Sequence, residues 1–580
     1  MNQRNVLLAV VMSAVLLLGW DALVGYLYPG ARNPAPPKVD TPVEQVAAPG
    51  SAPGIPGGGG GGVPTPRRTD LRSALASGDR VAIESPRLAG SINLATGAID
   101  DIVLKDYHEN VERGSDPVRL LSPAGTPAQQ FAEFGFLTNG ARLPAGPWQA
   151  DGARLTPATP VTLTKQAGGI TYRIRFSIDR NFMIRAEQRA DNTGTAGAVV
   201  QPYALINRTD RTASADMWIA HSGPMGVFGG EANYDVDYSD LVEDGPVTPA
   251  GRAGWTGFTD IYWLTALVPQ AGSQASAGFR SLGNSLYRAD LIYAPVTLAP
   301  GSAVSRSTQF FAGAKESGVL DAYEAAGVPQ FSFAIDWGWF SWFVKPFLWL
   351  LQQLFAFAGN FGLAIILLTV VVRAALFPIA QKGFASMAAM KAIQPRMKEI
   401  QTKYKDDKLK QQQEMQALFK NEGVNPLAGC LPMLLQMPIL YALYKVFVLA
   451  IDMRHQPFIL WIKDLSAPDP AMILNLFGLL PFTPPSFLGI GVLAVLLGVT
   501  MWLTFKLNPA PADPVQQQMF AIMPWVLMFA MAPFAAGLLL YWTTSNVLTI
   551  AQQKYLYAKH PQLRKAVEEE RAAAKAAAQG

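Results

Sequence analysis

The C-terminal half of the chain contains a series of long apolar segments, and these constrain the fold more than any other feature. The longest of them, residues 519–551, has 33 residues without Asp, Glu, Lys or Arg. A single helix of this length would reach about 50 Å, whereas the hydrocarbon core of a bilayer is about 30 Å thick. Because Pro533 lies near the middle, we expect two short membrane spans here. The chain is therefore predicted to be a polytopic α-helical membrane protein.

Apolar segments of membrane-spanning length also occur elsewhere, and together they predict six spans. The first begins near residue 5 and has two interpretations, a cleaved signal peptide or a retained anchor. No small-residue cleavage site follows its apolar core, and apolar residues resume as far as Tyr28, which favours a retained anchor over residues 1–28. The later spans are expected at about 360–378, 427–449, 487–506, 518–532 and 534–553.

A more polar stretch separates the first span from the others. Residues 29–69 are rich in Pro and Gly, including six consecutive glycines, and are expected to form a disordered linker. From about residue 81 to residue 311, apolar and polar residues alternate with a period of two, as in 170–178, between turns rich in Gly, Pro, Asn and Asp. This pattern predicts an inserted all-β domain over residues 70–330, an antiparallel sandwich. Residues 331–359 are expected to form a linker and an amphipathic helix at the membrane interface.

The distribution of basic residues orients the spans. Nine Lys and Arg residues lie in 378–426 and six follow residue 553, whereas residues 450–486 contain only two. Loops rich in Lys and Arg remain in the cytoplasm. We therefore expect both termini, the tail 558–580 and a helical hairpin over 380–422 in the cytoplasm, and the β-sandwich on the opposite side.

The sequence contains none of the common signatures of catalysis or metal binding. The motifs HExxH, GxSxG and CxxC are absent, as is a Walker A loop, and the four histidines lie in unrelated segments. The single cysteine, Cys430, excludes an intrachain disulfide, and a formal charge of +4 is too small to indicate nucleic-acid binding. We expect no enzymatic activity, no cofactor and no metal.

Arg373 is the most costly residue in the predicted spans. An arginine at the centre of a membrane helix costs about 2.5–3.5 kcal/mol on insertion scales, so it suggests a functional role. The alternative is that Arg373 lies close enough to the end of its span to reach the lipid headgroups. Thr369 lies one turn away on the same helical face. Further polar residues in the spans, Gln436 and residues 542–546, either bond between helices or line a hydrated cavity.

The predicted hairpin 380–422 carries a methionine-rich apolar stripe. Its members recur every three or four residues and include Met387, Met390 and Met397 on the first helix and Met415 on the second. Methionine-rich surfaces suit the recognition of varied apolar peptides. Packing of the two helices against each other is the other use of the stripe, and it accounts more simply for most of it.

Several strings in the later spans resemble the YidC/Oxa/Alb family of membrane protein insertases, in its Gram-negative form with a large periplasmic domain. The similarity is dense over residues 335–557 and mainly architectural over 70–330. The matching strings are NPLAGCLP at 425–432, QMPI at 436–439, VRAALFP at 372–378, FILWIKDL at 458–465 and GLLLYWTTSN at 537–546.

This resemblance implies a five-helix insertase core over residues 360–557 and a periplasmic β-supersandwich. In the family, the core surrounds a hydrophilic groove that opens to the cytoplasm and to lipid. Arg373 matches the groove arginine of the family, and Thr369, Tyr541 and Trp542 match positions that face the substrate. With Gln436 and Asn546, these residues are expected to line the groove, and the hairpin is expected to receive the substrate.

The implied function is to insert, fold and help assemble proteins of the bacterial inner membrane, alone or with the Sec translocon. The expected partners are nascent membrane proteins, the Sec translocon and membrane lipids. Binding of the ribosome and of the signal recognition particle receptor is an open alternative. Two other functions are compatible with six spans. A transporter is disfavoured because the spans show no inverted repeat, whereas a structural subunit of the translocon would overlap with an insertase.

Overall fold

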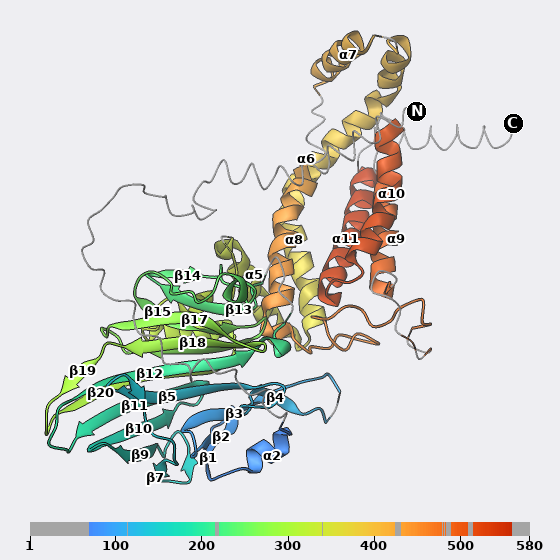
Figure 1. Ribbon diagram of the computed structural model, residues 1–580. Helices are drawn as coiled ribbons and strands as arrows, with labels where there is room; N and C mark the ends of the chain where they lie inside the picture. Colours follow the sequence, from blue (N-terminus) through green and yellow to red (C-terminus); the bar gives the residue numbers. More distant parts are fainter. Residues whose placement is uncertain are drawn as a thin grey trace, which may run out of the picture. The chain divides into compact units, whose positions relative to one another are not determined.

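The computed structural model describes residues 69–112, 114–214, 220–338, 340–405, 407–423, 431–477, 480, 482, 489–507 and 514–559 (Figure 1). The predicted first span, nearly all of the predicted linker and residues 560–580 lie outside this description, as do the side chains of some helical residues, Met387 among them.

Two β-sheets pack face to face in the first part of the described chain. The larger sheet contains eleven described strands: β1 (Arg80–Glu84), β2 (Leu88–Asn93), β3 (Ala98–His108), β4 (Pro117–Leu121), β5 (Gln130–Thr138), β6 (Ala141–Arg142), β8 (Arg154–Leu155), β12 (Ala198–Thr209), β17 (Ala275–Gly283), β18 (Leu286–Tyr293) and β19 (Val296–Leu298). The other contains nine: β7 (Gln149–Ala150), β9 (Val161–Ala167), β10 (Ile170–Ile178), β11 (Met183–Asn192), β13 (Gly223–Phe228), β14 (Glu231–Asn233), β15 (Ala253–Thr259), β16 (Trp263–Pro269) and β20 (Ala303–Ala314).

The alternating sequence explains how these sheets bury one face. In β10, Ile174 and Phe176 are fully buried, whereas the neighbouring Arg173 and Arg175 are exposed. Phe176 meets Phe134 of the opposite sheet edge to face, with ring centroids 5.6 Å apart. Among the described pairs of strands, only β1 and β8 run parallel. The predicted antiparallel sandwich is confirmed.

Short helices flank the sheets, and long helices follow them. The flanking elements are α2 (Leu71–Ala76), η1 (Asp210–Thr212), α3 (Asp240–Glu243), α4 (Ser317–Ala325) and η2 (Phe331–Ala334). The later elements are α5 (Ser341–Ala358), α6 (Phe361–Lys403), α7 (Lys408–Asn421), α8 (Leu431–Leu449), η4 (Ile451–Met453), α9 (Val492–Leu507), α10 (Pro514–Met531) and α11 (Ala536–Lys559). Helices α6, α8, α9, α10 and α11 lie side by side, with α11 against α6 and α9 (Figure 1).

Helix α5 has separate faces, as expected for an interfacial helix. Val344, Leu348 and Leu351 are buried toward the other helices. Trp342 and Phe357 are 68% and 85% exposed on another face. Exposed aromatic side chains of this kind are typical of a helix at the boundary between lipid and water.

Helix α6 joins two elements that the sequence separates. We expected a span ending near residue 378 and a hairpin beginning near 380, but one helix of 43 residues contains both the span and the first arm of the hairpin. Pro378 and Pro395 lie inside it. Each proline removes one backbone N–H donor, but α6 continues as a helix on both sides of each proline.

By helix length and composition alone, one described helix qualifies as a membrane span. Among the described residues, Phe361–Gly383 is the helical segment that is both long and apolar enough to cross a membrane. Leu434–Leu449, Val492–Leu507 and Gln517–Met531 are shorter apolar helices. The six spans expected from the sequence are therefore not established by helix length.

Candidate functional site

Arg373 lies on the side of α6 that faces α11. Its Nε donates a hydrogen bond to Ser545 Oγ at 3.0 Å, and its Nη2 donates to the same hydroxyl. Within the described part of the chain, no Asp or Glu lies within ion-pair distance of Arg373. Among the described residues, the guanidinium therefore has a neutral hydroxyl as its side-chain partner.

A second polar contact joins α8 to the same face of α11. Gln436 Nε2 donates to Tyr541 Oη at 2.7 Å, and the Tyr541 side chain is almost fully buried. Tyr541 precedes Ser545 by four residues, so the two side chains occupy neighbouring positions on one helical face. The structure thus brings Arg373, Gln436, Tyr541 and Ser545 onto three adjacent helices.

The remaining predicted groove residues take other positions. Asn546 Nδ2 donates to Thr500 Oγ1 of α9 at 3.2 Å, on a different side of α11 from Ser545. Trp542 is partly buried and packs against the apolar core. Thr369 is fully buried, and its hydroxyl donates to the carbonyl of Ile365 at 2.7 Å. Thr369 therefore makes a bond within its own helix and has no described bond to Arg373.

Ser545 was not among the predicted site residues. It belongs to the polar run at residues 542–546, whose sequence does not indicate which member faces Arg373. The spacing from Tyr541 was an available signal, because residues four apart share a helical face. Thr500 carried no such signal, since its partner Asn546 lies 46 residues away.

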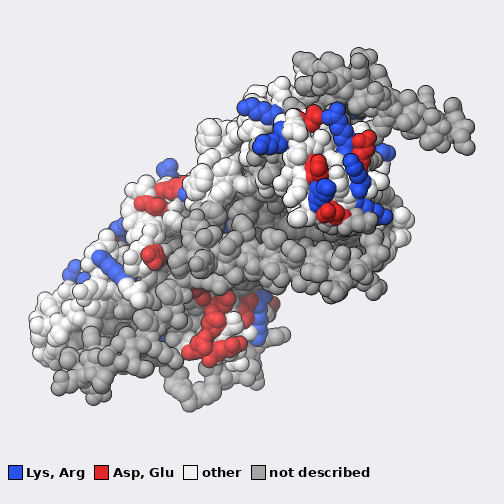
Figure 2. All heavy atoms as spheres, turned by 90° about the horizontal axis from the view of Figure 1, so that it is seen from above, with Lys and Arg blue, Asp and Glu red and all other residues white. Residues whose placement is uncertain are grey.

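The described methionines of the hairpin, Met390, Met397 and Met415, pack inside it. Met397 and Ile393 of α6 are 7% and 6% exposed, and Met390 of α6 packs around them. Met415, Leu418 and Phe419 of α7 complete this small core. Arg396 joins the two arms through an ion pair with Glu422. Figure 2, which looks down on the molecule, shows Lys and Arg interspersed with Asp and Glu over this hairpin.

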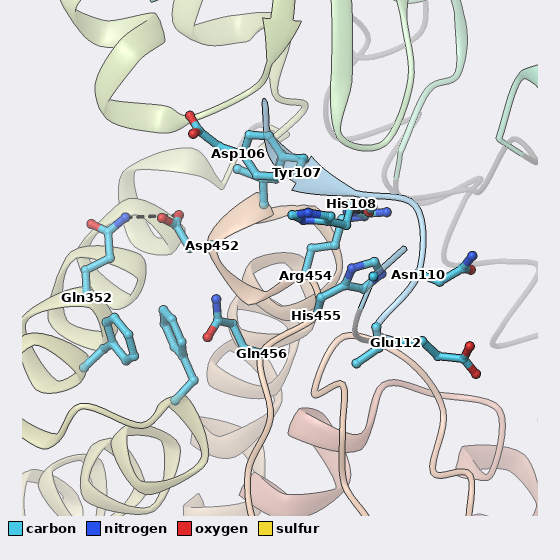
Figure 3. Close-up of a pocket in the computed structure, with 15 residues that line it drawn as sticks. Asp106, Tyr107, His108, Asn110, Glu112, Gln352, Asp452, Arg454, His455 and Gln456 are labelled. Atoms are coloured by element: carbon cyan, nitrogen blue, oxygen red, sulfur yellow. Dashed lines mark hydrogen bonds between the residues drawn. The ribbon is translucent and has the colours of Figure 1, made fainter. Parts of the chain in front are cut away.

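A cavity of about 680 Å³ lies away from these residues, between α5, the loop after β3 and the segment after α8 (Figure 3). None of the predicted site residues lines it. Asp452 accepts a hydrogen bond from Gln352 at its wall, and burial raises the pKa of this carboxyl. Burial, together with the neighbouring Arg454, lowers the pKa of His455.

Arg454 holds the wall of this cavity to the sheets. Its Nη1 donates to the carbonyl of His108 at 2.8 Å, and its Nη2 donates to that of Glu109 at 3.3 Å. The guanidinium also lies over the rings of Tyr262 and Trp263. These contacts join the segment after α8 to the sheets.

Comparisons with known proteins cover nearly the whole chain. The family described as 60Kd inner membrane protein matches residues 353–563, and the family described as YidC periplasmic domain matches residues 80–350. A protein of Zymomonas mobilis named membrane protein insertase YidC is 41% identical over 574 residues, which are 96% of each chain. A protein of Rhizobium johnstonii with the same name is 40% identical over 578 residues, again 96% of each chain. A crystal structure of an active YidC insertase aligns at 17% identity with a TM-score of 0.36, covering 82% of this chain and 95% of that one.

Proposed function

Because this chain belongs to the YidC family of membrane protein insertases, we propose that α6, α8 and α11 form the surface that receives its clients, the membrane proteins being inserted. Members of this family are non-enzymatic insertases and chaperones of the bacterial inner membrane. The sheet region of this chain is the periplasmic domain.

The proposed topology has six spans with both termini in the cytoplasm and the two sheets arranged as a β-supersandwich. Three observations support it: the excess of Lys and Arg in 378–426, the long apolar part of α6 and the exposed aromatic face of α5. In this arrangement α6, α8, α9, α10 and α11 form the insertase core, and the hairpin of α6 and α7 projects into the cytoplasm.

The observation that carries the proposed mechanism is the neutral partner of Arg373. A cation bonded to a hydroxyl keeps its attraction for an anion, whereas a cation paired with a carboxylate has lost most of it. We propose that water solvates Arg373 in a groove and that an acidic exported segment of a client meets it there. Gln436 and Tyr541 offer further polar groups on the neighbouring helices.

The driving force comes from the client itself. A span of about 20 apolar residues gains roughly 6–12 kcal/mol on entering the bilayer, at about 0.3–0.6 kcal/mol per residue. The obstacle is the polar segment that must cross. Helix α9 has 16 residues, which corresponds to about 24 Å against a hydrocarbon core of about 30 Å. Local thinning beside such a short helix would shorten the crossing.

The membrane potential would assist the transfer of an acidic segment. Moving a negative charge outward across 100 mV contributes about 2.3 kcal/mol.

The hairpin of α6 and α7 would bind a client before the client reaches the groove. It would do so through its polar and basic surface, because the described methionines Met390, Met397 and Met415 pack within it. Nascent membrane proteins are the proposed clients, and the Sec translocon, the ribosome and the signal recognition particle receptor are proposed partners, supported by family membership alone.

The charge of Arg373 is tested with clients that differ only in their exported segment, acidic or neutral. Arg373→Ala should slow insertion of the acidic client about tenfold, which corresponds to about 1.4 kcal/mol, and the neutral client about twofold. Arg373→Glu should be worse for the acidic client. Arg373→Lys should retain much of the activity, because a hydrated cation needs no fixed bidentate geometry.

Two variants control this experiment. Arg396→Ala removes an arginine that is largely exposed and paired with Glu422, and it should leave the ratio of acidic to neutral insertion unchanged. Ser545→Ala removes the described partner of Arg373 without removing the charge, so it should slow both clients about equally. Equal slowing of acidic and neutral clients by Arg373→Ala would contradict the proposed role of the charge.

A further inference from the structure

The segment after α8, residues 451–477, contacts the first residues of three long helices; we name it the outer loop. The first N–H groups of a helix have no acceptor within the helix, so each helix start needs acceptors or caps from elsewhere. At α6, Asn360 accepts from Leu363 N at 3.0 Å as the N-cap. The Nδ2 of Asn360 also donates to the outer-loop carbonyls of Pro457 and Phe458 at 3.3 Å.

The approach of the outer loop to α6 is very close. The ring of Phe458 lies where a side chain at position 362 would be, because a Cβ on Gly362 would come within 2.0 Å of it. Only glycine leaves room for this ring without displacing the helix or the loop.

The outer loop also satisfies the start of α11. Ala536 N donates to the carbonyl of Ala467, and Gly537 N donates to that of Leu465, both at 2.8 Å. These are the first two backbone N–H groups of α11. Backbone carbonyls thus serve here as caps in place of an N-terminal Ser, Thr, Asp or Asn side chain.

At α9, a buried carboxylate of the outer loop adds to backbone hydrogen bonds between the loop and the start of the helix. Asp469 is 2% exposed, and its Oδ2 accepts from Leu493 N, in the first turn of α9, at 2.8 Å. Its Oδ1 accepts from Trp461 Nε1 at 2.9 Å and from Ala471 N at 3.0 Å. A Cβ on Gly491 would lie 2.6 Å from the Cβ of Asp469, so the chain before α9 passes directly over this side chain.

The chemistry of Asp469 suits a residue that holds the outer loop in a fixed position against α9. A buried carboxylate is stable when several N–H donors replace the water it has lost. The start of a helix adds a favourable partial positive charge. Removal of the carboxylate would leave three donors without their acceptor. The outer loop would then be joined to the start of α9 only by backbone bonds, from Val492 N to the carbonyl of Ala471 and from Ile473 N to that of Ile490.

We infer that Asp469 is a positioning residue that keeps the outer end of the helical core closed, by fixing to α9 the same loop that caps α6 and α11. Arg373 lies 12 residues into α6, or about 18 Å from its start along the axis. A closed outer end therefore separates the polar contacts of Arg373 and Tyr541 from the periplasm. The inference rests on the proposed function only in placing this end of the core on the periplasmic side.

The test measures access to a buried reporter from the periplasmic side, with no client present. In the full-length protein with Cys430→Ser, Leu538→Cys places a thiol in α11 at a site that is 1% exposed in the native chain. A membrane-impermeant maleimide is added to spheroplasts. Labelling should be slow with native Asp469 and about tenfold faster with Asp469→Ala.

Milder variants keep the test valid if Asp469→Ala fails to accumulate in the membrane. Asp469→Asn preserves one oxygen for Trp461 and Ala471 but points an amide N–H at Leu493 N, and it should give an intermediate rate. Trp461→Phe removes one donor and should give the smallest increase. The matched control is Asp464→Asn, because Asp464 accepts only from His455 and Ser466 within the outer loop among its described hydrogen bonds.

Two outcomes would overturn the inference. One is native labelling rates in Asp469→Ala and Asp469→Asn when both proteins are present at native amounts. The other is an equal increase in Asp464→Asn, which would show general disturbance of the outer loop. Since no client is present, neither outcome depends on whether Arg373 attracts acidic segments.

Discussion

Arg208 in the periplasmic domain and Arg373 in the helical core have different kinds of side-chain partner. In the domain, Arg208 and Asp260 are each 4% exposed and form an ion pair. Burial opposes ionisation of Asp260, yet Arg208 and Ser214 hold the pKa of its carboxyl below the usual value. In the core, Arg373 donates to the neutral hydroxyl of Ser545. Arg208 thus has a carboxylate as its partner, whereas the described side-chain partner of Arg373 is a neutral hydroxyl.

The two regions also differ in what holds them together. Long antiparallel pairs such as β10 with β11 share an unbroken register over nine residues, so each strand is held by many backbone hydrogen bonds. The core helices satisfy their own backbones and meet through apolar packing and a few polar side-chain contacts. A region held by few contacts separates more easily for a client than a hydrogen-bonded sheet. The comparison predicts that insertion depends on the core and its hairpin far more than on the domain.

The largest effect is expected from removal of the hairpin. Deleting residues 380–422, with a short Gly/Ser connection in their place, should abolish insertion of a two-span client while the remaining helices still assemble. The physical reason is that the polar, basic surface that would first meet the client is lost. Insertion is measured by protease protection of the client in membrane vesicles.

A triple substitution distinguishes the role of the hairpin surface in insertion from the role of its buried methionines. Changing Met390, Met397 and Met415 together to leucine should retain most of the insertion, because these side chains pack between α6 and α7 and leucine fills a similar volume. Normal insertion without the hairpin would show that it is only a connection. Loss of insertion in the leucine variant, with the hairpin intact, would assign the methionines a direct role with clients.

A much smaller effect is expected from removal of the periplasmic domain. Deleting residues 70–310 should leave insertion of the same client above half of normal, since the polar contacts of α6, α8 and α11 all lie outside the deletion. Arg454 would lose its partners at His108 and Glu109. Arg454→Ala in the full chain is therefore the matched control for that loss. Complete loss of insertion by a truncated protein that is stably present in the membrane would contradict this prediction.

The smallest effect on insertion, and one confined to the domain, is expected at Lys315. It is 3% exposed, and burial lowers its pKa to about 8. An unfolded chain then binds more protons than the folded one between pH 8 and the ordinary lysine pKa of about 10.4, so stability should rise with pH in that window. The rise is at most about 3 kcal/mol for this group, and it is absent below pH 8, where both states are protonated.

Urea unfolding of the full chain, followed by the far-ultraviolet signal of the sheets, measures this rise at pH 7.5 and pH 10. Lys315→Met should remove this part of the pH dependence, whereas Lys105→Met, which changes an exposed lysine, should preserve it. Insertion at pH 7.5 should be unchanged in a Lys315→Met protein that folds. The same pH dependence in both variants would show that Lys315 is not the responsible group.

Local patterns in the sequence were sufficient to predict much of this protein. Alternation with a period of two predicted the sandwich, because a sheet with one buried face requires it. Long uncharged segments predicted the apolar helices, and the cost of an arginine in such a segment singled out Arg373. The resemblance of residues 335–557 to an insertase family is matched by the comparisons. Each of these signals is carried by residues within a few turns or one strand of each other.

The partners of these residues were decided only by the tertiary structure. Arg373 and Ser545 are 172 residues apart, Gln436 and Tyr541 are 105 apart, and no local periodicity relates such positions. Thr369 shares a face with Arg373, yet its hydroxyl bonds to Ile365 because a buried threonine in a helix has its own preceding carbonyl within reach. No local pattern marks Asp469. Two of its donors, Trp461 and Ala471, lie in its own loop, but only the tertiary structure brings the third, Leu493 N of α9, to its carboxylate.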